Sequence, residues 1–249
     1  MLIPSEQDFA QAVALWREWN GRINVISRKD EDNIFAHHIL HSLAIAQYLE
    51  TFYPSATDGC DNGVEHKALS DNELAETPLQ PRVLRRFRQP ADNQPVGLHA
   101  IVDATTKFLD VGCGGGFPGI PLAMVMPEAK FTLCDSIGKK VRVAQAVADG
   151  LELKNVECVN ARVESLQGQW DWIVSRAVTS LENFYPWVKG RFRNSILYLK
   201  GGDIDSEIAA LQRKFHIPDA NIRTWRIDSW LKDEYFAEKF VIEISRTDL

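Results

Sequence analysis

Cysteine, long apolar runs and signs of secretion are all scarce in this chain of 249 residues. No stretch of roughly 18 apolar residues occurs, and residues 1–8 lack the basic and apolar regions of a signal peptide. The cysteines form no Cys-x-x-Cys pair and are too widely spaced for a disulfide framework: they are Cys60, Cys113, Cys134 and Cys158. These absences exclude a zinc ribbon and a disulfide-stapled domain, so we expect reduced thiols, no membrane span and a cytoplasmic protein.

Positive charge is also in short supply, because 34 Asp and Glu residues outnumber 28 Lys and Arg residues and give a formal charge of −6. This balance excludes indiscriminate attraction to nucleic acid, so an RNA partner would have to bind a local basic patch. Hydrophobic residues make up 45% of the chain and charged residues 25%, which excludes a wholly disordered protein. No repeat of about 20 to 50 residues is found, which excludes solenoids and propellers.

Residues 1–53 have the spacing of helices. Apolar side chains recur at three- and four-residue steps over positions 9–16 and again over positions 34–45. Asp30 or Asp32 lies near the start of the second helix as a cap or dipole partner. We therefore predict a small N-terminal helical cap rather than a full domain.

Residues 54–104 differ sharply from their surroundings. Five of the eleven prolines fall here, amid polar and acidic segments that cannot readily bury a core of their own. We predict a polar, proline-rich and flexible insertion. Its arginines are either an RNA contact or a solvated cluster: Arg82, Arg85, Arg86 and Arg88.

Residues 105–249 alternate short apolar runs with helical patterns, which predicts a largely parallel sheet with helices on both faces. The last two runs are separated by too few residues for a crossover helix, so we expect them to pair antiparallel. The predicted strands are residues 107–111, 130–135, 156–161, 170–175, 195–200, 222–228 and 240–245. The predicted helices are residues 118–126, 139–151, 181–189 and 205–215.

A glycine-rich loop follows the first of these strands, in the run from Asp110 to Gly119. A strand, a glycine turn and a helix in this order place a ligand at the carboxyl end of the strand. A dinucleotide fits poorly, because Asp110 would repel a pyrophosphate and Pro118 removes a backbone donor from the helix start. The pattern Asp-x-Gly-x-Gly, with Gly112 and Gly114, instead suits S-adenosylmethionine, whose sulfonium and ammonium groups attract a carboxylate.

Three further strand ends supply candidate ligands of the same site. Asp135 ends the second strand, where it can accept hydrogen bonds from ribose hydroxyls of any adenosine ligand. Arg176 ends the fourth strand and should face the ligand across the switch point of the sheet. Lys200 ends the fifth strand, where it is either a contact to an RNA backbone or a solvated lysine.

Several motifs in order resemble the bacterial small-subunit ribosomal RNA guanine-N7 methyltransferase family RsmG, also called glucose-inhibited division protein B. The matching runs are residues 24–28, 37–43, 110–121, 133–142, 161–164, 175–177 and 199–201. The resemblance implies a class I S-adenosylmethionine-dependent methyltransferase with a Rossmann-like, doubly wound, seven-stranded sheet whose last strands are antiparallel. It also implies a 16S ribosomal RNA substrate, and it places five residues in the cofactor site: Gly112, Phe117, Val163, Glu164 and Arg176. The insertion at residues 54–104 departs from the family pattern.

The chemistry implied by this resemblance needs no general base, because guanine N7 carries an exposed lone pair and no proton. We expect a positioning mechanism with no certain catalytic residue, with Arg176 and Lys200 as candidates and with inert thiols at Cys113 and Cys134. His37 and His41 share a helix face, but we expect cap contacts there and no metal site. The alternatives are methylation of a protein or small molecule and a non-catalytic module that binds S-adenosylmethionine or RNA. Nothing in the sequence requires more than a monomer.

Overall fold

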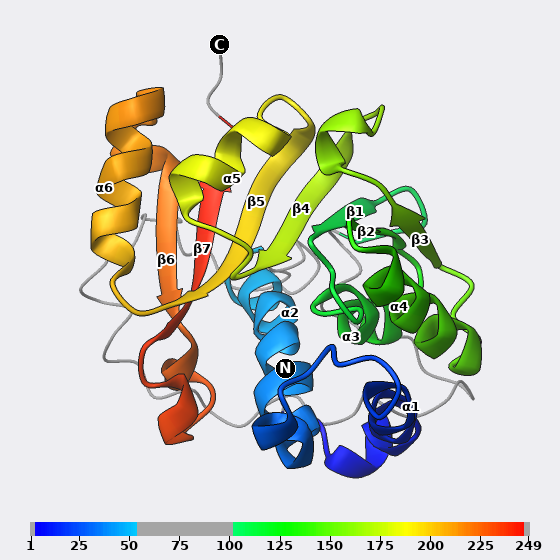
Figure 1. The fold of residues 1–249 in the computed structure, drawn as a ribbon. Coiled ribbons are helices and arrows are strands. Elements are labelled where there is room, and N and C mark those ends of the chain that lie inside the picture. Colours follow the sequence, from blue (N-terminus) through cyan, green and yellow to red (C-terminus); the bar gives the residue numbers. More distant parts are fainter. Residues whose placement is uncertain (1–2, 54–101, 247–249) are drawn as a thin grey trace, which may run out of the picture.

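The computed structural model describes residues 3–53 and 102–246, and it contains one seven-stranded sheet in the order β3-β2-β1-β4-β5-β7-β6 (Figure 1). The predicted flexible insertion and its arginines lie outside the described residues, apart from positions 102–104. The strands are β1 Lys107–Val111, β2 Lys130–Asp135, β3 Val156–Asn160, β4 Trp170–Arg176, β5 Phe192–Gly201, β6 Ile222–Arg226 and β7 Lys239–Ser245.

The predicted fold class is confirmed. Strands β1 to β5 are joined in parallel, and only β7 is reversed, because it pairs antiparallel with both β5 and β6. Every predicted strand is present, with two visible differences in length. Strand β5 starts at Phe192, three residues early, because Phe192 pairs with Trp170 across a register irregularity. Strand β6 stops at Arg226, because the chain turns into the 3-10 helix Ile227–Ser229.

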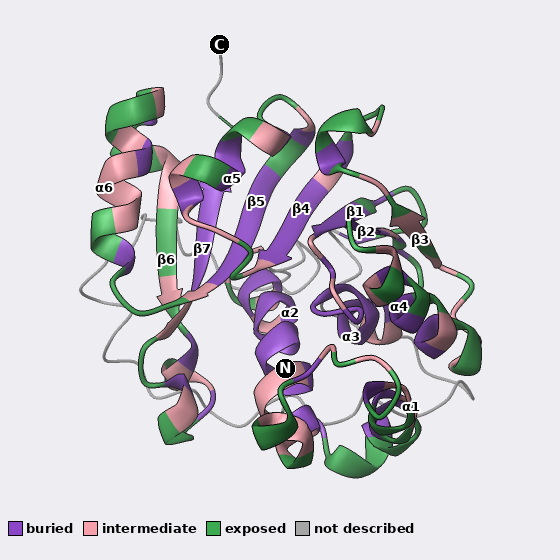
Figure 2. Cartoon of the chain, viewed as in Figure 1, coloured by how far each residue is buried: buried purple, intermediate pink, exposed green. Residues whose placement is uncertain are grey.

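Helices cover both faces of the sheet and divide the core into two clusters. One cluster joins α2, α3 and α4 to side chains such as Phe108 and Leu133, and the other joins α5 and α6 to side chains such as Leu109 and Ile173. Neighbours along β1 thus point to opposite faces, as a pleated strand requires. The central strands are buried along most of their length, whereas the edge strands β3 and β6 are largely partly buried or exposed (Figure 2).

The four helices predicted between the strands lie within one or two residues of their expected bounds, and two further α-helices lie in the N-terminal segment. They are α1 Ala10–Asn20, α2 Leu40–Phe52, α3 Gly119–Val125, α4 Gly138–Gly150, α5 Leu181–Val188 and α6 Ile204–Phe215. Short 3-10 helices are Glu6–Phe9, Arg28–Asn33, Val163–Ser165, Asp219–Asn221, Ile227–Ser229 and Glu234–Phe236. None of the helices in the described part of the chain has both the length and the apolar character needed to span a membrane.

The N-terminal segment contacts the carboxyl ends of the strands through residues such as Trp16 and His38, whereas α2 packs on one face of the sheet. Strands β4 and β5 run toward α2, whose buried residues belong to the same core cluster as α3 and α4 (Figure 1). The predicted second helix begins not as an α-helix but as the π-helical turn Ile34–Ile39, which continues into α2. The wider turn brings two consecutive histidines beside Asp30. Asp30 does not cap this helix, whose N-cap residue is Asn33, because its carboxylate accepts from His37 and His38 instead. The alternative role of Asp30 or Asp32 as a dipole partner stays a prediction.

A buried carboxylate on β7 links the carboxyl-terminal end of α2 to the sheet. Glu243 on β7 is 3% exposed and accepts hydrogen bonds from the hydroxyls of Tyr48, at 2.6 Å, Ser195, at 2.6 Å, and Tyr53. Arg223 on β6 completes the cluster at 3.4 Å. Both oxygens of Glu243 are thus fully used, and the cluster fixes the end of α2 against β5, β6 and β7.

Candidate functional site

The glycine loop leaves β1 and is tied to β2 by its first amides. The N–H groups of Gly112 and Cys113 both donate to the carbonyl oxygen of Cys134, at 2.8 and 3.1 Å. Gly112 has a φ of +72°, and a Cβ there would lie 2.5 Å from a methyl of Val178. Gly114 has a φ of +55°, yet a Cβ there would meet nothing within 4 Å. Glycine at both positions allows the positive φ angles of the loop, and open space lies beside Gly114.

Asp110 lies at the base of this loop and is fully buried. One oxygen, Oδ2, accepts from the backbone N–H of Gly119 at 2.8 Å, while Oδ1 has no hydrogen-bond partner within residues 3–53 and 102–246. Burial raises the pKa of Asp110 to about 7, against the opposing effects of the Gly119 hydrogen bond and of Arg176. A buried carboxylate with an unused oxygen is costly and is typical of a site completed by a ligand.

Asp135 ends β2 beside the same loop and is 8% exposed. Its Oδ2 accepts from Gly114 N–H at 3.0 Å, and its Oδ1 accepts from Ile137 N–H at 2.8 Å, as in an Asx turn. Each carboxylate oxygen can accept a second hydrogen bond, so these contacts orient Asp135 and leave capacity for a hydroxyl. Its role toward ribose stays a prediction.

Residues of the cap pack against the part of the loop that precedes α3, at Gly115 and Phe117. Phe117 is 3% exposed and stacks on Trp16 of α1, with ring centroids 4.2 Å apart. The Trp16 indole N–H donates to the carbonyl oxygen of Gly115 at 2.8 Å, and Val25 packs so closely that a Cβ on Gly115 would lie 2.8 Å from its methyl. No local pattern predicts these contacts, because they join residues about ninety to a hundred positions apart.

Arg176 emerges from the end of β4 between the loop and the cap. Its guanidinium carbon lies 5.0 Å from the centroid of the Phe117 ring, and its Nη2 donates to Nδ1 of His38 at 3.1 Å. Burial lowers the pKa of Arg176, an effect opposed by Tyr235, Asp110 and Asp30. The structure therefore brings Arg176 and Asp110 to the same edge of the sheet, as predicted from the topology.

The other predicted residues occupy different surroundings. Val163 is buried in the core cluster of α5 and α6, and Glu164 is exposed, with its backbone oxygen accepting from Arg191 at 2.8 Å. Lys200 pairs with Glu207 at 2.9 Å and donates to the Thr179 carbonyl at 3.1 Å. The ammonium of Lys200 is thus paired within the fold in this structure, and its role toward RNA stays a prediction.

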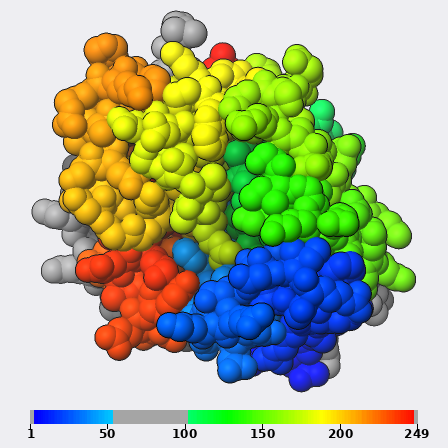
Figure 3. Space-filling view, viewed as in Figure 1, coloured from blue at the N-terminus to red at the C-terminus, as the bar shows by residue number. Residues whose placement is uncertain are grey.

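Two exposed apolar side chains on opposite sides of the loop were missed by the sequence analysis. Ile137, which follows Asp135, is 42% exposed, and Val178, which lies against Gly112, is 39% exposed. Both stand in loops just after strands, where hydrophobic periodicity gives no signal. In the space-filling view the darker green of the segment after β1 shows only in a recess between lighter green, yellow-green and blue surfaces (Figure 3).

Two thiols lie near the loop, and their surroundings are those expected of inert cysteines. Cys113 and Cys134 are buried, and burial raises the pKa of both, to about 11 for Cys134. His41 is buried and packs edge-on against Phe236, and within the described residues its Nε2 has no hydrogen-bond partner. Across the described ranges no three His, Cys, Asp or Glu side chains are arranged to hold a metal ion.

A basic hollow adjoins the Asp135 side of the loop. Its volume is about 530 Å³, and it lies between α4 and β3. A second hollow, of about 420 Å³, lies at the opposite edge of the sheet beside Asp171, far from the glycine loop in the topology. The first hollow is lined by Gly138, Lys139, Val141, Arg142, Gln145, Cys158 and Asn160.

Comparison with known proteins agrees with this geometry. The model of the family GidB, described as rRNA small subunit methyltransferase G, matches residues 95–225. A ribosomal RNA small subunit methyltransferase G from Flavobacterium psychrophilum is 36% identical over 244 residues, covering 95% of this chain and 88% of that relative. The chain belongs to this methyltransferase G family.

Other methyltransferase G relatives are similar over nearly the same length. The protein of Porphyromonas gingivalis is 35% identical and covers 95% of this chain and 85% of its own. Among solved structures, the magnesium protoporphyrin IX methyltransferase of Synechocystis, determined with bound SAM, is 17% identical with a TM-score of 0.44. That likeness covers 56% of this chain and 69% of the other.

Proposed function

We propose that this chain transfers the methyl group of S-adenosylmethionine to N7 of a guanine in 16S ribosomal RNA. Membership of the methyltransferase G family supports the reaction and the RNA class. The observation that carries the proposal concerns buried Asp110, whose Oδ1 has no partner among the described residues, at the base of a loop with open space at Gly114. A cationic ligand without phosphate is the kind that such a carboxylate would attract.

The residues present fit that cofactor. Asp110 offers a carboxylate oxygen, Asp135 retains acceptor capacity for hydroxyls, and Ile137 and Val178 expose apolar surface on either side of the loop. A pyrophosphate would instead be repelled by Asp110. The residues proposed to hold the cofactor are Asp110, Gly112, Gly114, Phe117, Asp135, Val163, Glu164 and Arg176, with Phe117 acting from beneath Arg176 because it is itself buried.

Bound S-adenosylmethionine supplies an electrophilic methyl group on a sulfonium. Guanine N7 attacks with its own lone pair, so no side chain has to remove a proton first. This agrees with the raised pKa of the nearby Cys113 and Cys134 thiols, which disfavours the thiolate form. The protein contributes alignment and exclusion of water, and alignment alone is worth up to about 7–11 kcal/mol in favourable cases.

The RNA is proposed to approach over the basic hollow beside Gly138. Lys139 and Arg142 line it, and both lie on α4, which follows the Asp135 loop directly. Because the whole chain carries a charge of −6, this local patch rather than net charge would hold phosphates. The target base would have to be unstacked to reach the glycine loop. We further propose that the enzyme acts as a monomer in the cytoplasm, where ribosomal subunits are assembled.

The test is transfer of labelled methyl from S-adenosylmethionine to small ribosomal subunits that lack the modification, with the modified base mapped. We expect label at one guanine N7 in 16S RNA and little label with Asp110→Asn. Label on protein alone would favour the protein-methylating alternative. Cofactor binding without transfer to RNA, protein or small molecules would contradict an enzymatic role and favour a binding module.

A further inference from the structure

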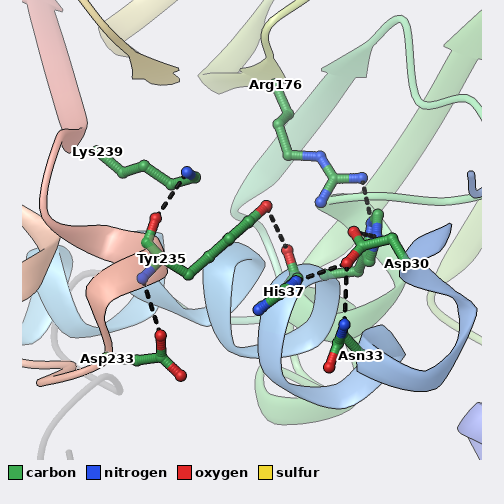
Figure 4. A network of polar contacts seen from close by, with 8 residues as sticks. Asp30, Asn33, His37, Arg176, Asp233, Tyr235 and Lys239 are labelled. Carbon is green, nitrogen blue, oxygen red and sulfur yellow. Dashed lines mark hydrogen bonds and ion pairs between the residues drawn. The ribbon is translucent and has the colours of Figure 1, made fainter.

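A chain of polar contacts runs from Asp30 in the cap to Arg176 at the end of β4 (Figure 4). Each oxygen of Asp30 forms a hydrogen bond with one histidine. Oδ1 lies 2.6 Å from His37 Nδ1, and Oδ2 lies 2.7 Å from His38 Nε2. The other ring nitrogen of His38 lies 3.1 Å from Nη2 of Arg176. Arg176 is 138 positions away in sequence and belongs to β4.

The direction of these hydrogen bonds follows from the donors available. A guanidinium can only donate, so His38 Nδ1 must accept and cannot carry a proton. The proton of His38 therefore sits on Nε2 and is donated to Asp30. Burial, reinforced by the charge of Arg176, lowers the pKa of His38 to about 4, which keeps the ring neutral near pH 7. Asp30 thus fixes the one tautomer that can accept from Arg176.

The cap also supports the aromatic ring against which the guanidinium lies. Arg176 lies over Phe117, and Phe117 lies on Trp16 of α1. An arginine held by an acceptor at one edge and by a ring on one face has little rotational freedom left. The contacts with His38 and Phe117 therefore set the direction of its remaining N–H groups, although Arg176 itself belongs to β4.

We propose that Asp30 and His38 are positioning residues for methyl transfer, holding Arg176 in the orientation in which it serves the reacting site. This inference rests on the proposed function. It assigns Asp30 and His38 no contact with substrate or cofactor, because they act through Arg176. It also explains the π-helical turn Ile34–Ile39, which brings His37 and His38 together beside one carboxylate.

His37 provides the matched control. It binds the other oxygen of Asp30 and stacks on Tyr235 with ring centroids 3.6 Å apart. Within residues 3–53 and 102–246 it makes no hydrogen bond, ion pair or ring contact with Arg176. Loss of His37 should therefore weaken the cap about as much as loss of His38. Only loss of His38 should release Arg176.

The experiment measures kcat and KM of methyl transfer for Asp30→Asn, His38→Gln and His37→Gln, each alone and combined with Arg176→Lys. We expect Asp30→Asn and His38→Gln to lower kcat about tenfold, with KM for the cofactor changed about twofold or less. In the Arg176→Lys background the same changes should cost about twofold or less, because the group they hold is gone. His37→Gln should have the same effect in both backgrounds. Losses from Asp30→Asn and His38→Gln that are equal in both backgrounds would overturn the proposal.

Two further readouts separate positioning from loss of structure. The amide oxygen of Asn lies near the Nδ1 position of a histidine, whereas that of Gln lies near Nε2, so His38→Asn should keep more activity than His38→Gln. Restricted rotation of the Arg176 guanidinium, seen by ¹⁵N NMR, should be lost in Asp30→Asn and kept in His37→Gln. If the wild type transfers no methyl but this NMR difference is found, the proposed function fails and the positioning device stands. If the wild type is active and Arg176 rotates equally in all variants, the positioning device fails.

Discussion

Two carboxylates are buried in this protein to nearly the same depth, but their surroundings differ. Glu243, 3% exposed, accepts from three hydroxyls and pairs with Arg223, so both of its oxygens are used. Asp110, 0% exposed, accepts from one backbone N–H and leaves Oδ1 without a partner in the described residues. The first carboxylate fixes α2 to the sheet, and the second lies under the glycine loop.

The difference shows how this fold separates stability from binding. A satisfied buried carboxylate costs little and rigidifies its neighbours, whereas an unsatisfied one destabilises the free protein. Unfavourable groups of this kind are retained where a ligand removes the cost. Replacing each carboxylate by its amide should therefore have opposite consequences.

The largest effect is expected for Asp110→Asn on cofactor affinity. Removing the charge should raise the Kd for S-adenosylmethionine about 100-fold, the loss expected for a buried charge-assisted contact. Stability should stay the same or rise, because a costly buried acid is gone. Calorimetric titration and thermal unfolding measure the two quantities. If Asp110→Asn lost much stability and kept its affinity for S-adenosylmethionine, Asp110 would be a structural carboxylate like Glu243.

Glu243→Gln should show the reverse pattern. The amide NH₂ replaces an acceptor that buried hydroxyls need, so we expect unfolding free energy to fall by about 2 kcal/mol. Cofactor affinity of the folded protein should be unchanged. Chemical denaturation gives the stability, and titration below the unfolding temperature gives the affinity. An affinity loss as large as that of Asp110→Asn would contradict a purely structural role.

A pair of glycines gives the smallest and sharpest test. Gly114 and Gly190 both have positive φ, and a Cβ on either would meet nothing within 4 Å. Alanine at each should cost about 1 kcal/mol of stability through backbone strain. Only Gly114→Ala should weaken cofactor binding, by about tenfold, because its methyl enters the space proposed for the ligand. Equal affinities for the two variants would place the ligand elsewhere.

The sheet and the glycine loop could be predicted because their signals are local. A strand such as residues 107–111 runs straight into glycines, and a short link forces the last two strands antiparallel. The polar surroundings of each candidate could not be predicted. Lys200 is held by Glu207, and Arg176 is held by His38 and Phe117, which are partners brought together only by tertiary packing.

The cap shows the same limit. Apolar periodicity located both N-terminal helices, yet nothing in it distinguished a π-helical turn from an α-helix at Ile34–Ile39. The contact of Trp16 with the Gly115 carbonyl also has no sequence signature. The sequence therefore predicted that N-terminal helices exist, but it did not predict how these helices contact the glycine loop.

The pKa of Asp110 supplies the most direct test of its role. Since burial raises that pKa to about 7, the free protein carries a proton there at pH 6. A bound sulfonium or ammonium favours the carboxylate and lowers its pKa, so binding must release the proton, and affinity must increase as the pH rises toward and past 7.

The decisive measurement is the number of protons released when S-adenosylmethionine binds at pH 6, obtained by calorimetry in buffers of different ionisation enthalpy. The account predicts release of close to one proton by the wild type and none by Asp110→Asn. Equal proton release by both proteins, with equal affinity, would show that Asp110 does not face the bound cofactor.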